Sequence, residues 1–137
     1  MNIQLGKVIF HLNKIVRGKI PEIMFSLGQE PEVLKLTGED LRQKMVDNLL
    51  EEVAELDPSS SSFYEELADV KQATEDLLTL VDGEEVERLR LEKREERGDF
   101  SDGFYISKLV LDSNDEWVEY YRREPEKYKE EILDNGE

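Results

Sequence analysis

Two stretches in the middle of the chain repeat their apolar residues at the spacing of an α-helix. The first begins after Thr37 and carries Leu41, Met45, Leu49, Val53 and Leu56. The second begins after Ser62 and carries Phe63, Leu67, Val70, Leu77, Leu78 and Val81. Steps of three and four residues place side chains on one face of a helix. The pattern therefore predicts two amphipathic helices.

Short polar signals mark where these two helices begin and end. Each opens on a hydroxyl residue with an acid three residues later, Thr37 with Asp40 and Ser62 with Glu65, which favours a capped N-terminus. Turn sequences close them, Asp57-Pro58 with a serine run for the first and Asp82-Gly83 for the second. Because the linker is short, we expect the two helices to pack antiparallel with their apolar faces together.

The remaining elements are shorter or more polar. Imperfect alternation predicts strands over residues 3–12 and 104–111, which pair as a short β-ribbon. Helices are predicted over 22–27, after Pro21 and before Gly28, over 84–97 before Gly98, and over 117–133. The expected fold is mainly α, a helical bundle with this ribbon. We expect one domain over residues 1–111, with an acidic helical tail over 112–137 packed on it.

Four carboxylates fall on or beside the apolar faces of the two central helices. At about 100° per residue, Glu52 lies within the first apolar arc and Glu55 on its edge. Glu66 lies on the flank of the second arc and Asp69 just outside it. Burying such groups without cations costs several kcal/mol each. The spacing therefore predicts a divalent-metal site, against the alternative that these are ordinary solvated faces of an acidic protein.

Composition narrows which metal such a site could hold. The chain has no Cys and a single His, His11, so the ligands must be oxygens. Oxygen ligands suit Mg²⁺, Mn²⁺ or Ca²⁺. Near the same faces lie Asn48 and Asp76, which serve either as auxiliary ligands or as polar edges.

The charge balance limits the class of partner. The net charge is −16, from 34 acidic and 18 basic residues, which argues against nucleic acid as a partner because phosphate backbones need a basic surface. A phosphorylated small molecule stays compatible, since bound metal ions reverse the local sign. The chain has no membrane-length apolar run and a polar start, so we expect no membrane partner and a cytoplasmic location.

Basic residues are concentrated at the start of the chain. Residues 1–21 contain no acid and four bases, Lys7, Lys14, Arg17 and Lys19. Residues 112–137 contain ten acids and four bases, a net charge of 4 − 10 = −6, which we interpret as a solubilising tail.

Three short motifs resemble a known superfamily. Glu51-Glu52-Val53-Ala54-Glu55 followed by Glu66-Leu67-Ala68-Asp69-Val70 resembles the E-E-x-x-E … E-x-x-D signature of the all-α nucleoside triphosphate pyrophosphohydrolases. That superfamily includes MazG proteins, dimeric dUTPases and phosphoribosyl-ATP pyrophosphohydrolase. Residues 14–21, KIVRGKIP, resemble the K-L-V-R-D-K-I-P opening of a MazG-like subgroup, and residues 93–100, KREERGDF, its basic stretch ending in R-G-x-F. The matches span about residues 13–100.

The resemblance implies a reaction and assigns residues to it. It implies Mg²⁺-dependent hydrolysis, with Mn²⁺ as a substitute, of a nucleotide at its α–β phosphate bond in nucleotide-pool housecleaning. The metal ligands would be Glu52, Glu55, Glu66 and Asp69, with Glu52 and Glu55 as the catalytic residues. The cations near the phosphates would be Lys14, Arg17, Lys19, Lys93 and Arg97, unless these are ordinary surface charges. A MazG-like four-helix bundle would form on oligomerisation, so we expect a homodimer or homotetramer.

Three departures from the family pattern keep other functions open. Gly18 stands where the family has Asp, only ten residues separate Glu55 from Glu66, and the acidic tail has no counterpart. One alternative is a metal- or nucleotide-binding protein that has lost catalysis. Another is an acidic structural or interaction module.

Overall fold

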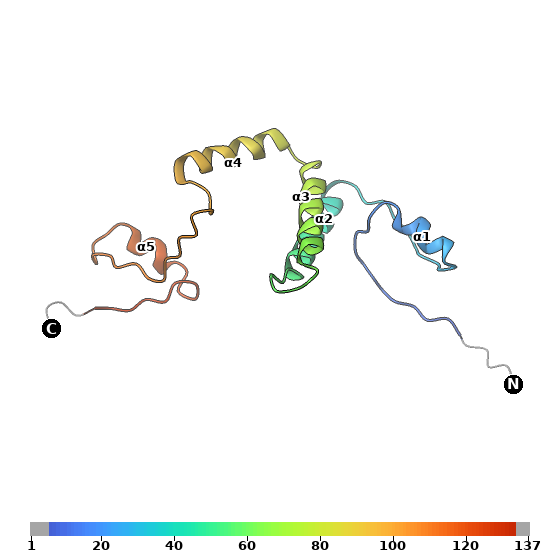
Figure 1. Ribbon diagram of the computed structural model, residues 1–137, viewed down its shortest axis with the longest axis horizontal. Coiled ribbons are helices and arrows are strands. Elements are labelled where there is room, and N and C mark those ends of the chain that lie inside the picture. Colours follow the sequence, from blue (N-terminus) through green and yellow to red (C-terminus); the bar gives the residue numbers. More distant parts are fainter. Residues whose placement is uncertain (1–5, 134–137) are drawn as a thin grey trace. The chain divides into compact units, whose positions relative to one another are not determined.

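The computed structural model describes residues 6–133 and shows a mainly helical protein (Figure 1). Its helices are α1 (Ile20–Ser26), α2 (Gly38–Ala54), α3 (Phe63–Leu78), α4 (Gly83–Arg97) and α5 (Trp117–Arg122). The chain divides between Glu96 and Arg97 into two compact units. The predicted domain boundary at residue 112 therefore falls inside the second unit.

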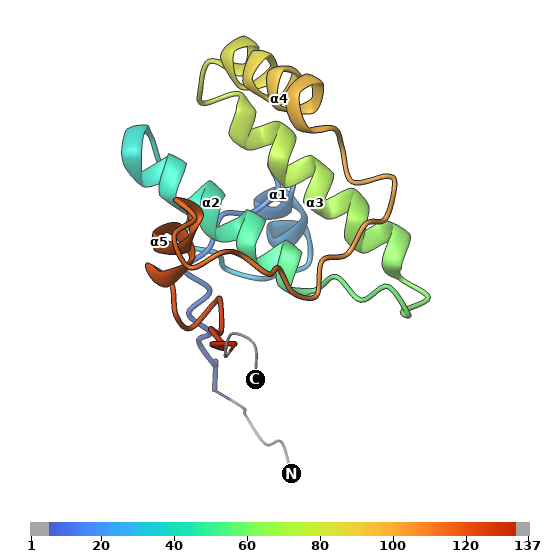
Figure 2. The same cartoon turned by 90° about the vertical axis from the view of Figure 1, so that its left-hand side faces the viewer.

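Helices α2 and α3 form the main helix–helix contact of the protein. They lie side by side in Figures 1 and 2, joined by the short linker that contains Pro58. Ala73 on α3 is 3% exposed and is the one buried apolar residue among those described. Val70 and Leu77, one turn to either side of it, are half-buried. The core is therefore a narrow seam between two amphipathic helices, as their apolar periodicity predicts.

Most of the predicted helix starts and stops are confirmed, although α3 ends at Leu78, before the predicted stop at Asp82-Gly83. Pro21 lies in the first turn of α1, and Gly28, just after that helix, has a φ of +77°, which favours glycine. Gly98 follows α4 with a φ of +81°. Thr37 and Ser62 stand at the N-caps of α2 and α3, but neither side chain makes the predicted capping hydrogen bond.

The predicted β-ribbon is wrong. Residues 104–111 and the described part of the first segment, 6–12, are extended or irregular, while residues 3–5 lie outside the described part. Their apolar side chains are mostly exposed, with Phe10 at 80% and Phe104 at 90%, while Leu111 is half-buried. A strand requires backbone hydrogen bonds to a partner strand. Alternation alone supplies no such partner, so both segments stay without strand structure.

The predicted terminal helix is too long. α5 ends at Arg122, although the prediction extended it to residue 133. Pro125 explains the early end, because proline lacks a backbone N–H and disfavours helical geometry in the residue before it. The aromatic side chains of this segment pack together, since the rings of Trp117 and Tyr120 are 5.2 Å apart and those of Tyr121 and Tyr128 are 5.0 Å apart. Nowhere in residues 6–133 is a helix long and apolar enough to span a membrane.

Candidate functional site

Three acidic residues are, taken as whole residues, less exposed than the other acids near them. Within residues 6–96, Glu52 on α2 and both Glu66 and Asp69 on α3 are half-buried, and every other acidic residue of that range is exposed. These are three of the four predicted metal ligands. The fourth, Glu55, is exposed at the C-cap of α2. Half-burial follows from helical spacing, which places these residues beside the apolar seam.

Glu52 lies at the electrostatic centre of this group. Burial raises the pKa of its carboxyl above the ordinary value, and the nearby negative charges of Glu55, Asp69 and Glu51 raise that pKa further. Only Lys14 acts in the opposite sense. The negative form of Glu52 is therefore disfavoured by its surroundings, and a cation bound beside it would relieve the repulsion.

The basic segment that precedes α1 reaches this acidic surface. The Arg17 guanidinium donates a hydrogen bond from Nη2 to Oδ1 of Asp69 at 2.8 Å. The Lys14 ammonium lies 3.3 Å from Oε1 of Glu51. Two of the five cations that the resemblance assigned to phosphate binding thus contact the acidic side of α2 and α3. We call residues 12–17 the basic arm.

The other three predicted cations belong to α1 and α4. Lys19 is the N-cap residue of α1, and Lys93 and Arg97 are exposed on the last turns of α4. Within the described residues of the first unit, neither Lys19 nor Lys93 forms an ion pair or hydrogen bond with the four predicted ligands.

The donor chemistry suits a hard divalent cation, but the side chains as they stand do not form a ligand set. Oε1 of Glu66 accepts a hydrogen bond from the backbone N–H of Asp57 at 3.2 Å, and Asp69 is paired with Arg17. No three acidic or histidine side chains in the described range converge closely enough to hold a metal ion. Metal binding would therefore require these side chains to converge, either through the carboxylate oxygens that Asp57 and Arg17 leave free or by displacing those partners.

Sequence reasoning missed one functional contact of the arm. Glu51 points away from the apolar arc of α2, so periodicity excluded it from the site. The structure instead pairs Glu51 with Lys14 and so fixes the arm on the helix. Since the arm has no regular secondary structure, its contacts left no periodic signal in the sequence; the concentration of bases in residues 1–21 was the available indication.

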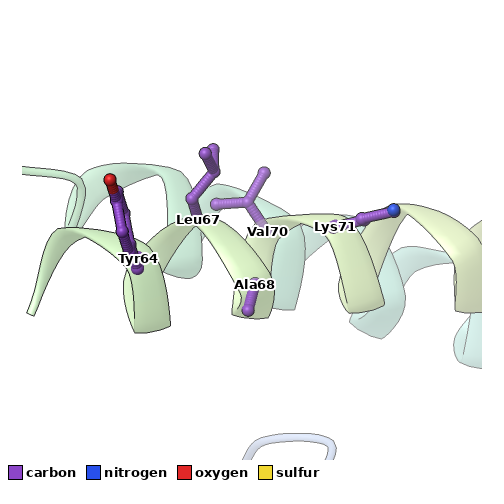
Figure 3. A pocket seen from close by; sticks show the side chains of 5 residues that line it. All are labelled: Tyr64, Leu67, Ala68, Val70 and Lys71. Atoms are coloured by element: carbon purple, nitrogen blue, oxygen red, sulfur yellow. The ribbon is translucent and has the colours of Figure 1, made fainter.

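A mostly apolar hollow lies on the side of α3 that is opposite to the candidate site (Figure 3). Its volume is about 490 Å³, and its lining is mostly apolar, with Tyr64, Leu67, Ala68, Val70 and Lys71. At about 100° per residue, this side is opposite to Asp69. The hollow contains no carboxylate and is separate from the candidate site.

Comparison with models of known families, with curated proteins and with solved structures finds no match to this chain. What points to a function in this chain is the set of short motifs together with the placement of its acidic and basic side chains.

Proposed function

We propose that this protein is a Mg²⁺-dependent nucleotide pyrophosphohydrolase, with Mn²⁺ as a substitute, that acts in nucleotide-pool housecleaning. It would convert a nucleoside triphosphate and water into the monophosphate and pyrophosphate. The observation that carries the proposal is selective burial. The half-buried acids of residues 6–96 are Glu52, Glu66 and Asp69, which are positions of the E-E-x-x-E … E-x-x-D pattern. No composition effect explains this selection, because the many other acids of that range are exposed.

The proposal gives each group at the site a chemical task. Glu52, Glu55, Glu66 and Asp69 would hold Mg²⁺, which when bound neutralises phosphate charge and acidifies a water molecule. Arg17 and Lys14 would bind the triphosphate oxygens in place of their present partners, Asp69 and Glu51. Glu55, exposed beside Glu52, would accept the proton of the attacking water.

We also propose that the chain works as a homodimer or homotetramer. Leu50 and Val53 on α2 are 62% and 45% exposed, and Tyr64 and Leu67 on α3 are 86% and 47% exposed. By helical spacing these residues lie on the side of the α2–α3 pair opposite to Glu55 and Asp69. A second copy packed on this side would bury the apolar residues and leave the carboxylates accessible.

Pyrophosphate release tests the proposed reaction. The assay uses a panel of ordinary and modified nucleoside triphosphates with Mg²⁺ or Mn²⁺. We expect Glu52→Gln to lower the rate about 100-fold, the order of loss seen when a metal site is weakened. Glu65→Gln is the matched control, because Glu65 adjoins Glu66 in sequence but is exposed. Release that is equal in Glu52→Gln and the wild type would refute the assigned site.

Gly18 supports a second candidate, nucleotide binding without turnover. A Cβ atom added at Gly18 would meet nothing within 4 Å, and Asp is therefore accommodated there. If the wild type binds a metal–nucleotide complex but releases no pyrophosphate, and Gly18→Asp gains release, the protein is a binding protein that has lost catalysis. If both proteins release pyrophosphate at the same rate, Gly18 does not limit catalysis.

A further inference from the structure

A smaller pocket of about 180 Å³ lies between the basic arm and α2. The arm supplies Leu12, Asn13, Lys14 and Ile15, and the helix supplies Lys44, Asp47, Asn48 and Glu51. The helical residues follow steps of three and four, so they share one face of α2. Because that face continues to Glu55, the pocket lies beside the candidate carboxylate site.

Two polar contacts hold the arm over this face. Lys14 pairs with Glu51 at 3.3 Å, and the Lys44 ammonium donates to the backbone carbonyl of Asn13 at 3.5 Å. Asn13 has a φ of +48°, a left-handed conformation that asparagine tolerates better than most residues. The pocket is therefore formed by a bent segment fastened at two points.

The charges that line the pocket favour a neutral ligand over a phosphate. The lining contains two cations, Lys14 and Lys44, and two carboxylates, Asp47 and Glu51. Their formal charges cancel, and a phosphate placed here would meet both carboxylates. A polar but uncharged ring avoids this repulsion while still finding hydrogen-bond donors and acceptors on the walls.

Asn48 is the pocket residue best suited to recognise such a ring. It is half-buried, and its amide makes no hydrogen bond to any described residue. A carboxamide offers one acceptor and one donor side by side, the pattern that pairs with the edge of a nucleobase. Leu12 and Ile15 of the arm supply aliphatic surface for the faces of a flat ring.

The size and position of the pocket fit one part of a nucleotide. Pockets for drug-sized ligands have volumes of roughly 300–1,000 Å³, so 180 Å³ accommodates a single ring system and not a whole nucleotide. Lys14 connects the two regions, because it lines the pocket and also acts electrostatically on Glu52. A ligand with its ring in the pocket would extend its phosphates toward Glu52 and Arg17.

We infer that this pocket binds the base of the nucleotide and that Asn48 reads the hydrogen-bonding edge of that base. The inference rests on the proposed function in one respect: the direction of the phosphates assumes that the ligand is the nucleotide substrate. Binding of the ring itself requires neither catalysis nor a metal ion.

The first test measures selectivity in the full-length protein. We compare kcat/KM for ATP, CTP, UTP and ITP in the wild type, in Asn48→Leu and in Asn48→Asp. Leucine has a similar size but no polar group, so discrimination between the best and the worst base should fall about tenfold. Aspartate only accepts hydrogen bonds when ionised, so preference should shift toward adenine and cytosine, whose amino groups donate. The control is Gln72→Leu, which removes an exposed amide on α3 that bonds to Asp76. Unchanged selectivity in both Asn48 variants would overturn the inference.

The second test separates the pocket from the hydrolase proposal. Adenosine, cytidine, uridine and inosine, which carry no phosphate, are titrated without metal into the wild type and followed by NMR. We expect shifts of the Asn48 side-chain amide and of the Leu12 and Ile15 methyl groups, with no shifts in Asn48→Leu. Such shifts without pyrophosphate release would sustain the pocket and refute the hydrolase. Pyrophosphate release with no nucleoside-induced shift at these groups would refute the base pocket and support the hydrolase.

Discussion

Glu52 illustrates how one half-buried carboxyl can link stability to pH. Its pKa is raised in the folded protein, first by burial and then by the charges of Glu55 and Asp69. An acid with a higher pKa in the folded than in the unfolded state stabilises the fold while both states are protonated. That stability is lost as the pH rises from the ordinary value of 4.5 through the folded value.

This linkage predicts the effect of removing the charge. In metal-free buffer at pH 7, Glu52→Gln should raise the free energy of unfolding, because the amide has no charge to repel Glu55 and Asp69. The gain should disappear below pH 4.5, where the wild-type carboxyl is protonated in both states. Urea unfolding at several pH values measures both effects, with Glu75→Gln as the control, because Glu75 is exposed and lies away from the first turn of α3. A loss of stability in Glu52→Gln at pH 7 would contradict the prediction.

The elements that could be predicted are those whose signal is local. The apolar spacing in α2 and α3 indicates the face that each helix turns toward the other. Gly28 and Gly98 mark helix ends where φ is positive. The strands predicted at 3–12 and 104–111 failed because pairing depends on distant residues that alternation does not reveal. Position on the helical wheel placed four carboxylates on or beside the apolar faces, and all of them except Glu55 are half-buried. It could not reveal the ion pair between Lys14 and Glu51, because the basic arm has no regular secondary structure and so no periodic pattern.

The contact between the basic arm and α3 gives a prediction at the level of elements. Arg17 and Asp69 are 63% and 43% exposed, so their ion pair contributes at most about 1 kcal/mol. Arg17→Gln should free Asp69 and raise the affinity for Mg²⁺ alone, by up to about fivefold. The same change should lower kcat/KM for the nucleotide about tenfold or more, because a charge-assisted hydrogen bond to phosphate is lost.

Calorimetric titration with Mg²⁺ and the pyrophosphate assay measure the two effects separately. Arg42→Gln on α2 serves as the control, since Arg42 is exposed and forms no ion pair with the described residues. If Arg17→Gln weakens Mg²⁺ binding, Arg17 and the metal do not compete for Asp69, and the assigned role of the arm is wrong.

The small apolar core of the protein requires an explanation. Ala73 is the one apolar residue buried within the described part of the chain, although α2 and α3 carry a full set of large apolar side chains. Two helices alone bury too little apolar surface for a stable domain, and small folds commonly gain the remainder by association.

Self-association through the apolar side of the α2–α3 pair is therefore expected to be disrupted by charge. Leu67→Glu should weaken the oligomer at least about tenfold, because a carboxylate would be buried without a partner. Sedimentation equilibrium over a range of concentrations measures the change. Leu109→Glu is the control, since Leu109 is a leucine of the second unit that is 57% exposed. If Leu67→Glu leaves the association constant unchanged, the interface lies on another surface.

The ion pair between Arg17 and Asp69 has a consequence for the order in which ligands bind. Mg²⁺ alone would claim Asp69 and leave the guanidinium without a counter-charge, while a free triphosphate would claim Arg17 and leave the carboxylate unbalanced. A bound metal–triphosphate complex would replace both partners at once, so that Asp69 and Arg17 would each gain a new counter-charge. Metal and nucleotide should therefore show positive heterotropic coupling, each tightening the binding of the other by the same factor. Under the proposed function, the pair would make the protein selective for the metal–triphosphate complex over either of its components.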